Sequence, residues 1–425
     1  MTTIANELQA KGEAARRAAR QLARASTNVK NRALNAIADA LLGRAADIVE
    51  ANALDVTAAQ EAQLAPALVD RLKLNVDKLQ AIASDTRDVA ILPDPVGEMT
   101  DARTLPNGLQ IGRRRVPLGV IAAIYESRPN VTVDIASLCL KAGSATILRG
   151  GKETINSNKM LAGVIREAIS AAGVPADAVQ LIENTDRALV GDLLQMKDVI
   201  DLVVPRGGAE LIRYVADNAT MPVLIGGTGV CHTYVDASAD VDKAVRIAHN
   251  AKTRRFTICN ALDTLLVHAD VAGRYLPEIG RSWADAGVEM HCDERSLEIL
   301  RESGVSGNII PASASDFGHE FWALTAAIKV VDSLDDAIEH IYGYGTGHSD
   351  AIVTEDYSAA MRFVDEVDTA VCYVNASTQF TDGAQFGLGA EIIDSTQKTI
   401  ARGPVGLREI TTYKWIVFGN GQVRP

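Results

Sequence analysis

The sequence predicts an α/β protein built on parallel sheets, and three observations support this fold class. Near-continuous aliphatic runs such as GVIAAIY and IDLVVP are typical of strands that are covered on both faces. Such runs alternate with stretches of helical periodicity along most of the chain. At 425 residues the chain is long enough for two or three domains, each with its own core. We therefore expect doubly wound α/β domains.

The N-terminal part is expected to be helical, followed by a hairpin. Over residues 4–65, apolar side chains recur at the three-and-four spacing of one buried helical face. Further on, Asn107 and Gly108 lie between two extended segments, which is the signal of a tight hairpin. We expect this hairpin, residues 105–118, to serve as an interface or a brace.

Crossover units of a parallel sheet are expected after the hairpin. A strand at 121–125, a turn, a helix at 133–141 and the strand ATILRGG make the first unit. A second unit reads AVQLIE, a helix near 187–196, VIDLVVP and a helix that opens on two glycines. From about 260 to 385 the chain has its own alternation, including DTLLVH and DAIVTED, which predicts a second domain.

Composition excludes several classes of protein. A formal net charge of -12 argues against nucleic acid or an anionic membrane as the main partner. No apolar run approaches the ~18–20 residues that a membrane-spanning helix needs. The charged N-terminus lacks the apolar core of a signal peptide, so we expect a cytoplasmic protein. The five cysteines are scattered without metal-ligand spacing, so we expect free thiols and no metal site.

The segment KTRRFTICNALDTLLVH contains the strongest candidate nucleophile, Cys259. A thiolate is stabilised by nearby positive charge, and Lys252, Arg254 and Arg255 precede this cysteine closely in a predicted loop. The alternative is a small buried apolar cysteine, an interpretation that fits Cys139 in the apolar helix DIASLCLKAG. From the residues alone, both interpretations of Cys259 stay open.

Three turns are candidate ligand sites because each follows a predicted strand. In YESRPN, Asn130 could donate its amide N–H to a ligand oxygen, and the alternative is an ordinary helix-cap or turn asparagine. The turns LRGGK and PRGGAE combine cations with paired glycines, which suits phosphate groups, although tight turns also use such glycines. The chain has neither a GxGxxG fingerprint nor a P-loop, so a standard dinucleotide site or a P-loop nucleotidase is not expected.

Taken together, the segments resemble the gamma-glutamyl phosphate reductase family, the proline-biosynthesis branch of the aldehyde dehydrogenase superfamily. The resemblance covers most of the chain in family order, through RRRVPLGVIAAIYESRPNVTVDIASLCLKAGSATILRGGKE, PRGGAELIR, GGTGVCHTYVD, NAKTRRFTICNALDTLLVH, YGTGHSDAIVTED and FTDGAQFGLGAEIIDSTQKTIARGP. It implies an aldehyde dehydrogenase-like fold of two doubly wound α/β domains plus a small oligomerisation β-element. The implied domains are a cofactor-binding domain at 1–104 and 119–255, a catalytic domain at 256–385, and the oligomerisation element with a C-terminal return at 105–118 and 386–425.

The resemblance also implies roles for individual residues. Cys259 matches the family nucleophile, and Asn130 looks like the superfamily asparagine of the oxyanion hole. Arg149 and Lys152 match the adenosine-side cofactor turn, where their charge suits the 2′-phosphate of NADPH. Glu320 resembles the glutamate that holds the nicotinamide ribose. Further cofactor contacts are expected at Gly207, Gly208 and Gly227, and substrate contacts at Arg255, Ser377 and Thr378.

The reaction that the resemblance implies is the NADPH-dependent reduction of L-glutamyl 5-phosphate to L-glutamate 5-semialdehyde, through a Cys259 thioester and with release of phosphate. It further implies a homo-oligomer and an upstream glutamate 5-kinase as a partner. One alternative is an aldehyde dehydrogenase that transfers the acyl group to coenzyme A. The other is a catalytically silent scaffold of the same fold.

Two sequence features bear on this reaction. Ordinary aldehyde dehydrogenases carry a water-activating glutamate just before the glycine pair that matches 226–227, but here no carboxylate lies between Asp217 and Asp236. Without a local base, we expect phosphate rather than water to resolve the thioester. Gln379 stands where the family usually has arginine, and Phe256 where proline is common. Both departures concern substrate affinity more than the type of reaction.

Overall fold

The computed structural model describes residues 2–424 and divides them into two compact units. The predicted first domain begins at Met1 and the predicted last segment ends at Pro425, and both of these residues lie outside the described residues. Unit 1 holds the chain up to Ile225, Gly387–Ile393 and the residues from Val405, and unit 2 holds Gly226–Phe386 and Asp394–Pro404.

Unit 1 is built on a four-stranded parallel sheet with the strand order β5-β4-β3-β6. All six residues of the central strand β3 are buried, as the uninterrupted apolar run VIAAIY predicts. The strands are β3 (Val120–Tyr125), β4 (Ala145–Gly150), β5 (Val179–Leu181) and β6 (Leu202–Arg206). The helices are α1 (Thr2–Leu22), α2 (Thr27–Gly43), α3 (Ala45–Glu61), α4 (Pro66–Leu72), α5 (Val76–Ile91), α6 (Val131–Lys141), α7 (Ile155–Ala171), α8 (Ala188–Leu193) and α9 (Ala209–Asn218), with short turns η1 (Lys152–Thr154) and η2 (Ala176–Ala178).

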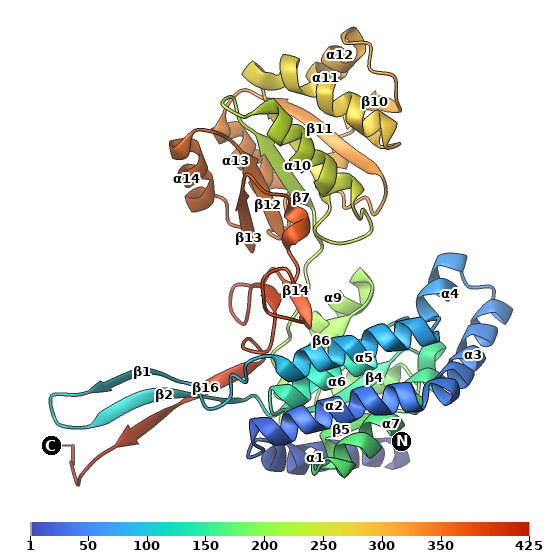
Figure 1. Ribbon diagram of the computed structural model, residues 1–425, viewed down its shortest axis with the longest axis vertical. Helices are drawn as coiled ribbons and strands as arrows, with labels where there is room; N and C mark the ends of the chain where they lie inside the picture. Colours follow the sequence, from blue (N-terminus) through green and yellow to red (C-terminus); the bar gives the residue numbers. More distant parts are fainter. Residues whose placement is uncertain (1, 425) are drawn as a thin grey trace. The chain divides into compact units, whose positions relative to one another are not determined.

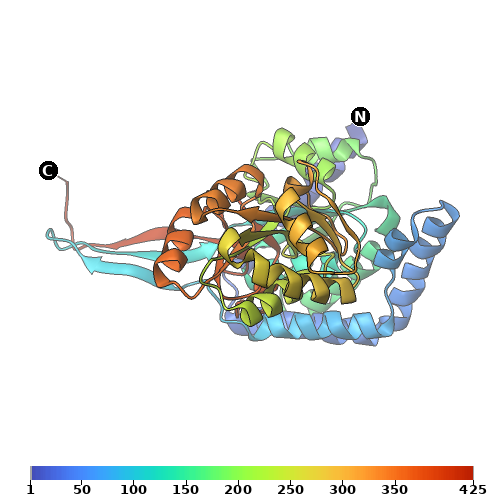
Figure 2. The same ribbon diagram turned by 90° about the horizontal axis from the view of Figure 1, so that it is seen from above.

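The predicted hairpin is confirmed as part of a three-stranded antiparallel sheet of unit 1. Strands β1 (Met99–Thr104) and β2 (Gln110–Pro117) form the hairpin, and β16 (Thr411–Phe418) pairs with the other edge of β2. Gly108 takes a φ of 85° in the connecting turn, a conformation that glycine adopts without strain. The three strands extend away from the four-stranded sheet of their unit as a narrow ribbon (Figures 1 and 2).

Unit 2 is built on a seven-stranded parallel sheet with the strand order β10-β9-β11-β8-β7-β12-β13. Its strands are β7 (Cys231–Val235), β8 (Leu262–His268), β9 (Glu289–Cys292), β10 (Ile309–Pro311), β11 (Thr325–Val331), β12 (Ser349–Val353) and β13 (Val371–Val374). Its helices are α10 (Val241–Thr253), α11 (Ala269–Asp285), α12 (Glu294–Glu302), α13 (Leu334–Tyr344) and α14 (Tyr357–Glu366), with short turns η3 (Asp316–Gly318) and η4 (Thr378–Phe380). Strands β14 (Ile393–Ser395) and β15 (Gly403–Val405) pair with each other where the chain changes units.

The first boundary between the units differs from the predicted domain boundary. The sequence prediction ended the cofactor-binding domain at residue 255, whereas unit 2 begins at Gly226. The physical reason is strand pairing, because β7 lies between β8 and β12 in the sheet of unit 2. Helix α10 packs against α11 and β8 of the same unit. The functional labels given to the domains stay predictions.

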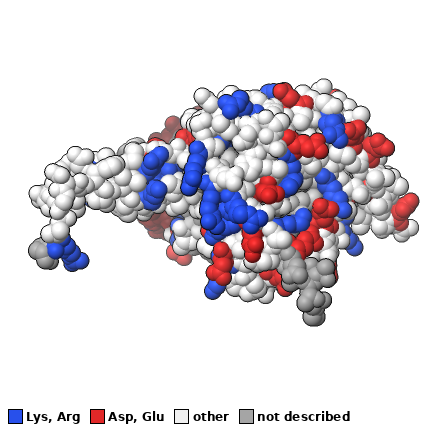
Figure 3. All heavy atoms as spheres, turned by 90° about the horizontal axis from the view of Figure 1, so that it is seen from below, with Lys and Arg blue, Asp and Glu red and all other residues white. Residues whose placement is uncertain are grey.

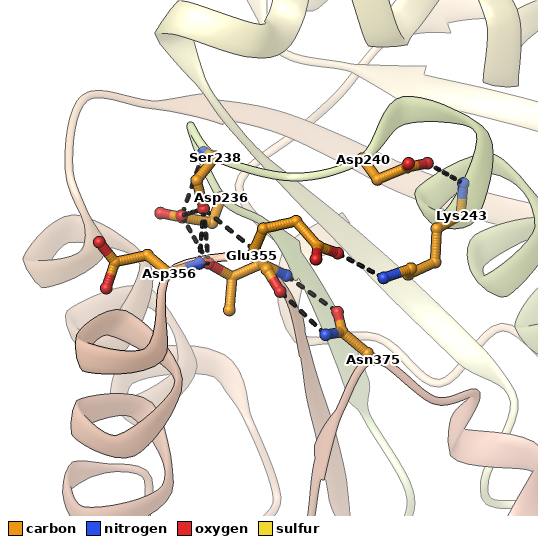
Figure 4. Close-up of polar contacts among 8 residues, drawn as sticks. Asp236, Ser238, Asp240, Lys243, Glu355, Asp356 and Asn375 are labelled. Atoms are coloured by element: carbon orange, nitrogen blue, oxygen red, sulfur yellow. Dashed lines mark hydrogen bonds and ion pairs between the residues drawn. The ribbon is translucent and has the colours of Figure 1, made fainter.

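A network of side chains closes the carboxyl ends of β7 and β12 in unit 2 (Figure 4). Asp236 follows β7 and accepts hydrogen bonds from Ser238 Oγ at 2.7 Å and from Thr354 Oγ1 at 2.8 Å. Asn375 accepts from the Thr354 N–H at 3.0 Å and donates to its carbonyl at 2.8 Å. These polar groups satisfy one another, so the network has a structural role at the ends of these two strands. The candidate catalytic residues of the unit lie at the opposite edge.

Among residues 2–424, no helix combines the length and the apolar character that a membrane span requires. Figure 3 shows Lys and Arg side chains gathered in one area of the face that it views. A net charge of -12 therefore leaves room for local cationic areas that anionic ligands could approach.

Candidate active site

The amino edge of the sheet in unit 2 brings the candidate catalytic residues together. Strands β8, β7 and β12 are neighbours, and all three run parallel. Since parallel strands begin at the same edge, the segments that precede them converge there. These segments contain Cys259 before β8, Gly229 before β7 and His348 directly before β12.

Cys259 lies half-buried at this edge with its thiol directed at a carboxylate. Its Sγ donates to Asp394 Oδ2 at 3.9 Å. Its backbone carbonyl accepts the thiol of Cys231 at 3.2 Å. Asp394 is held in turn by its own backbone, because the Gly227 N–H donates to the Asp394 carbonyl at 3.3 Å. Burial raises the pKa of Cys231 well above its ordinary value, so Cys231 is a protonated structural donor.

His348 completes a cluster with Cys259 and Asp394. One ring nitrogen of His348, the Cys259 sulfur and an Asp394 carboxylate oxygen all lie within 4.8 Å of one another. The imidazole is buried, and burial lowers the pKa of His348 to about 4, so the ring is neutral near pH 7. Nδ1 lies 2.9 Å from Ser349 Oγ, while Nε2 has no hydrogen-bond partner among the described residues.

Gln379 braces the loop that carries the cysteine. Its buried amide Nε2 donates to the carbonyls of Ala251 at 2.9 Å and Arg255 at 3.2 Å. Its Oε1 accepts from the Arg254 guanidinium at 3.3 Å. The amide side chain that stands where the family usually has arginine thus ties the end of α10 to the cysteine loop through hydrogen bonds.

The residues expected to bind substrate have different environments. Arg255 is exposed, as a ligand-binding cation requires. Ser377 and Thr378 are buried, and the Thr378 hydroxyl donates to the Asn260 carbonyl at 2.6 Å. Thr378 therefore holds the backbone of Asn260, the residue that follows Cys259. Substrate binding by these three residues stays a prediction.

Lys252 is buried and pairs with a carboxylate. Its ammonium donates to the Leu262 carbonyl at 2.9 Å and lies 3.5 Å from Asp263 Oδ1. Burial lowers the pKa of Lys252, and burial raises the pKa of Asp263 to about 6 against the opposing charge of the lysine. The positive charge of Lys252 is thus used to neutralise Asp263, in contrast to the expectation that it faces the thiolate.

Glu320 lies beside the segment that precedes β7. It accepts a hydrogen bond from the Gly229 N–H, while burial, reinforced by the charge of Asp263, raises the pKa of Glu320 to about 7. Its Oε1 is buried and has no hydrogen-bond partner among the described residues. Gly227 packs against the Thr396 side chain. Both residues belong to the same unit as Cys259, and their contacts with a cofactor stay predictions.

The remaining predicted residues collect at the carboxyl edge of the sheet in unit 1. Register places the last residues of β3, β4 and β6 side by side at that edge. Asn130 occupies the N-cap position of α6 just after β3 without a side-chain capping bond, and its amide Nδ2 donates to Asp134 Oδ2 at 2.9 Å. Burial raises the pKa of Asp134 to about 6. Asn130 therefore keeps one amide hydrogen for a ligand.

The two glycine turns of unit 1 follow β4 and β6. Arg149 is buried, and its guanidinium donates to the carbonyls of Gly150 at 3.0 Å and Thr185 at 2.9 Å. Lys152 is exposed at the same turn. In the other turn the Gly208 N–H at the start of α9 donates to Glu126 Oε2 at 3.1 Å. Lys152 is thus better placed than Arg149 to meet a phosphate.

Sequence reasoning missed two members of the site, His348 and Asp394. The stretch between Asp217 and Asp236 indeed lacks a carboxylate, but the structure brings Asp394 to the thiol from elsewhere in the chain. The inference that no base lies near Cys259 is therefore corrected. No sequence pattern links positions 259, 348 and 394, because only strand order and the contact of 394–396 with Gly226 and Gly227 join them.

Comparisons with known proteins agree with this architecture. A model of the aldehyde dehydrogenase family matches residues 3–296. The gamma-glutamyl phosphate reductase of Dehalococcoides mccartyi is 58% identical over 418 residues, which cover 98% of each chain. The crystal structure of gamma-glutamyl phosphate reductase from Thermotoga maritima superposes with a TM-score of 0.95 at 48% identity, covering 99% of this chain and 100% of that chain.

A more distant structure shares the fold alone. The acetylating aldehyde dehydrogenase of Geobacillus thermoglucosidasius has a TM-score of 0.69 at 17% identity, over 100% of this chain and 99% of that chain. The predicted fold class, aldehyde dehydrogenase-like α/β with parallel sheets, is therefore confirmed.

Proposed function

The chain belongs to the gamma-glutamyl phosphate reductases, a branch of the aldehyde dehydrogenase family, and we propose that it reduces L-glutamyl 5-phosphate to L-glutamate 5-semialdehyde. The observation that carries this proposal is the pairing of a half-buried cysteine with a carboxylate that can accept its proton. An enzyme of this branch is an oxidoreductase of proline biosynthesis that uses a nicotinamide cofactor.

Chemistry begins at the Cys259 sulfur. Transfer of the thiol proton to Asp394 leaves a thiolate, which attacks the carbonyl carbon of the acyl phosphate. The carbon–oxygen bond to phosphate breaks, inorganic phosphate leaves with the bonding electrons, and a thioester on Cys259 remains. The Cys259 backbone N–H and the Asn130 amide are the proposed donors to the oxyanion, and each such donor is worth about 3–4 kcal/mol.

A bound nicotinamide would supply the hydride that reduces this thioester, and the carbon–sulfur bond then breaks, so that Cys259 leaves as a thiolate and the semialdehyde is released. Four of the predicted residues suit such a cofactor. The N-terminus of α9 already holds an anionic group, since Glu126 accepts the Gly208 N–H, so the turn at Gly207 and Gly208 is suited to a pyrophosphate. Lys152 is proposed to meet the adenosine-side phosphate, which favours NADPH, and Glu320 to hold the nicotinamide ribose.

The proposed reaction also implies a preceding enzyme and a shared compartment. An acyl phosphate must be supplied by a kinase, so we propose a glutamate 5-kinase as the preceding enzyme and the cytoplasm as the shared compartment.

We also propose a homo-oligomer, because β1 and β16 leave their outer edges unpaired in the three-stranded sheet. Tyr413, Trp415 and Phe418 are exposed on β16, as an interface strand requires.

The reverse reaction tests this function, since glutamyl phosphate is labile. Glutamate semialdehyde and NADP are mixed with and without inorganic phosphate, and the absorbance of NADPH is followed. We expect turnover that requires phosphate and that is lost in Cys259→Ala. The control variant is Cys372→Ala, which removes another partly buried thiol of unit 2 and should keep activity.

Three outcomes would overturn the proposal. Turnover without phosphate would mean that a carboxylate such as Asp394 activates water, as in an ordinary aldehyde dehydrogenase. Turnover that requires coenzyme A in place of phosphate would identify an acylating enzyme. Full activity in Cys259→Ala would exclude the cysteine mechanism altogether.

A further inference from the structure

We infer that Cys259, His348 and Asp394 form a binding site for a divalent cation of the zinc class. The three side chains offer a thiol sulfur, an imidazole nitrogen and a carboxylate oxygen, and these atoms lie within 4.8 Å of one another. This is the donor set that Zn²⁺ accepts at sites with three protein ligands and one open position. No other feature of the described residues combines these three ligand types so closely.

The distances suit a tetrahedral ion after a small adjustment. Zn–S and Zn–N bonds of about 2.3 and 2.0 Å place tetrahedral ligand atoms roughly 3.3–3.5 Å apart. The Cys259 sulfur and the Asp394 Oδ2 already lie 3.9 Å apart. Side-chain rotations that move the ligand atoms by less than ~1.5 Å would bring the three atoms to bonding distance of one ion.

A supporting shell orients the imidazole for this purpose. A proton on Nδ1 of His348 would be donated to Ser349 Oγ, which lies 2.9 Å away. The Ser349 hydroxyl lies 2.7 Å from Thr381 Oγ1, and that oxygen lies 2.8 Å from the Tyr373 hydroxyl. Metal-binding histidines are commonly fixed in this way through their second ring nitrogen. The lone pair is then on Nε2, the buried nitrogen that has no hydrogen-bond partner among the described residues.

The donor set also decides which metals bind. A sulfur and an imidazole nitrogen favour Zn²⁺, Co²⁺ and similar ions, whereas Mg²⁺ and Ca²⁺ require a shell of oxygen ligands. Binding converts the Cys259 thiol to a metal-bound thiolate and releases one proton to the solvent. A sulfur that is bound to a metal cannot attack a carbonyl carbon. The cation would therefore switch the nucleophile off reversibly, a consequence that rests on the proposed function.

The test is direct titration of the purified full-length protein, first treated with a chelator, with Co²⁺. We expect one equivalent to give a thiolate-to-Co²⁺ charge-transfer band in the near ultraviolet, and excess Zn²⁺ to abolish it. Cys259→Ser should lose the band. His348→Ala and Asp394→Asn should each weaken binding by at least ~10-fold. Absence of the band in the wild-type protein would overturn the proposal.

A matched control addresses a second histidine of the same unit. His291 lies 2.8 Å from Glu289 Oε1 and 3.1 Å from Asp316 Oδ2, so it too could attract a cation. We expect His291→Ala to keep the charge-transfer band. Loss of the band in His291→Ala but not in His348→Ala would place the metal elsewhere and overturn the inference. Circular dichroism of each variant establishes that the chain is folded.

Activity measured on the same samples separates this inference from the proposed function. If both hold, the chelator-treated enzyme oxidises the semialdehyde with phosphate, Zn²⁺ inhibits it, and the chelator restores it. A cobalt band in a protein without this activity supports the metal site and contradicts the proposed reaction. Activity that is unaffected by Zn²⁺ in a protein without the band contradicts the metal site alone.

Discussion

Gly229 lies so close to Cys259 that a Cβ on the glycine would stand 1.6 Å from the Cys259 carbonyl oxygen. No side chain fits at that distance, so the segment before β7 fixes the position of the loop that carries Cys259. The same glycine donates its N–H to Glu320. One residue without a side chain thus positions two of the candidate functional groups.

The first prediction follows from this contact. Gly229→Ala must push the Cys259 loop away, and a displacement of about 1 Å at a reacting group can cost ~100-fold in rate. We expect kcat to fall by about that factor. The control is Gly273→Ala in α11, where nothing lies within 4 Å of the added Cβ. That variant should keep its activity and gain about 0.4–1 kcal/mol in stability.

The second prediction concerns the brace at Gln379. Gln379→Ala removes the two hydrogen bonds to the carbonyls of Ala251 and Arg255, each worth about 1 kcal/mol. We expect kcat to fall ~10-fold, because the cysteine loop loses its tie to α10, with a smaller change in KM for the cofactor. Gln385→Ala, an exposed glutamine nearby in sequence, is the control and should behave as wild type. Unchanged kcat in Gln379→Ala would contradict the bracing role.

The third prediction is a loss of stability at the buried pair of Lys252 and Asp263. Lys252→Met leaves the Asp263 carboxylate buried without its partner, which typically costs about 3–5 kcal/mol. Urea unfolding should report this loss. Lys243→Met removes an ammonium that pairs with Glu355 near the surface, and it should cost at most ~1 kcal/mol. Equal effects of the two variants would contradict the account of Lys252.

The fourth prediction is a pH dependence that originates at Glu320. Its pKa rises from 4.5 to about 7 on folding, so the folded chain binds this proton more tightly than the unfolded chain. The free energy of unfolding should therefore fall as pH rises through that window. Glu320→Gln should remove this part of the slope between about pH 5 and about pH 8. Urea unfolding at several pH values measures it, with the exposed Glu339→Gln as a variant whose slope should match wild type.

The fold was predictable because its signals are local. The apolar run of β3 and the Asn-Gly turn at 107–108 each act within a few residues, and the structure has a buried strand and a hairpin at these positions. The start of unit 2 was not predictable in the same way. β7 looks like any other buried strand, and only its pairing with β8 and β12 assigns it to the second sheet.

The site was predictable only where one segment carries the signal. Its loop and its neighbouring cations made Cys259 the strongest candidate nucleophile, and only the family resemblance assigned it that role. His348 and Asp394 could not, because strand order and a backbone contact bring them to the thiol. Charge alone was also misleading, since Arg149 uses its guanidinium on backbone carbonyls and Lys252 is buried against Asp263. Sequence shows which charges exist, and tertiary contacts determine which of them can meet a ligand.

The central claim is that Cys259 forms a thioester, and trapping that thioester tests it most directly. Glutamate semialdehyde and NADP are mixed with the enzyme in the absence of phosphate, quenched with acid, digested and analysed by mass spectrometry. We predict a glutamyl adduct on the peptide that contains Cys259, which disappears when phosphate is added before the quench. An adduct on another residue, or rapid turnover of NADP with no adduct at all, would contradict the account.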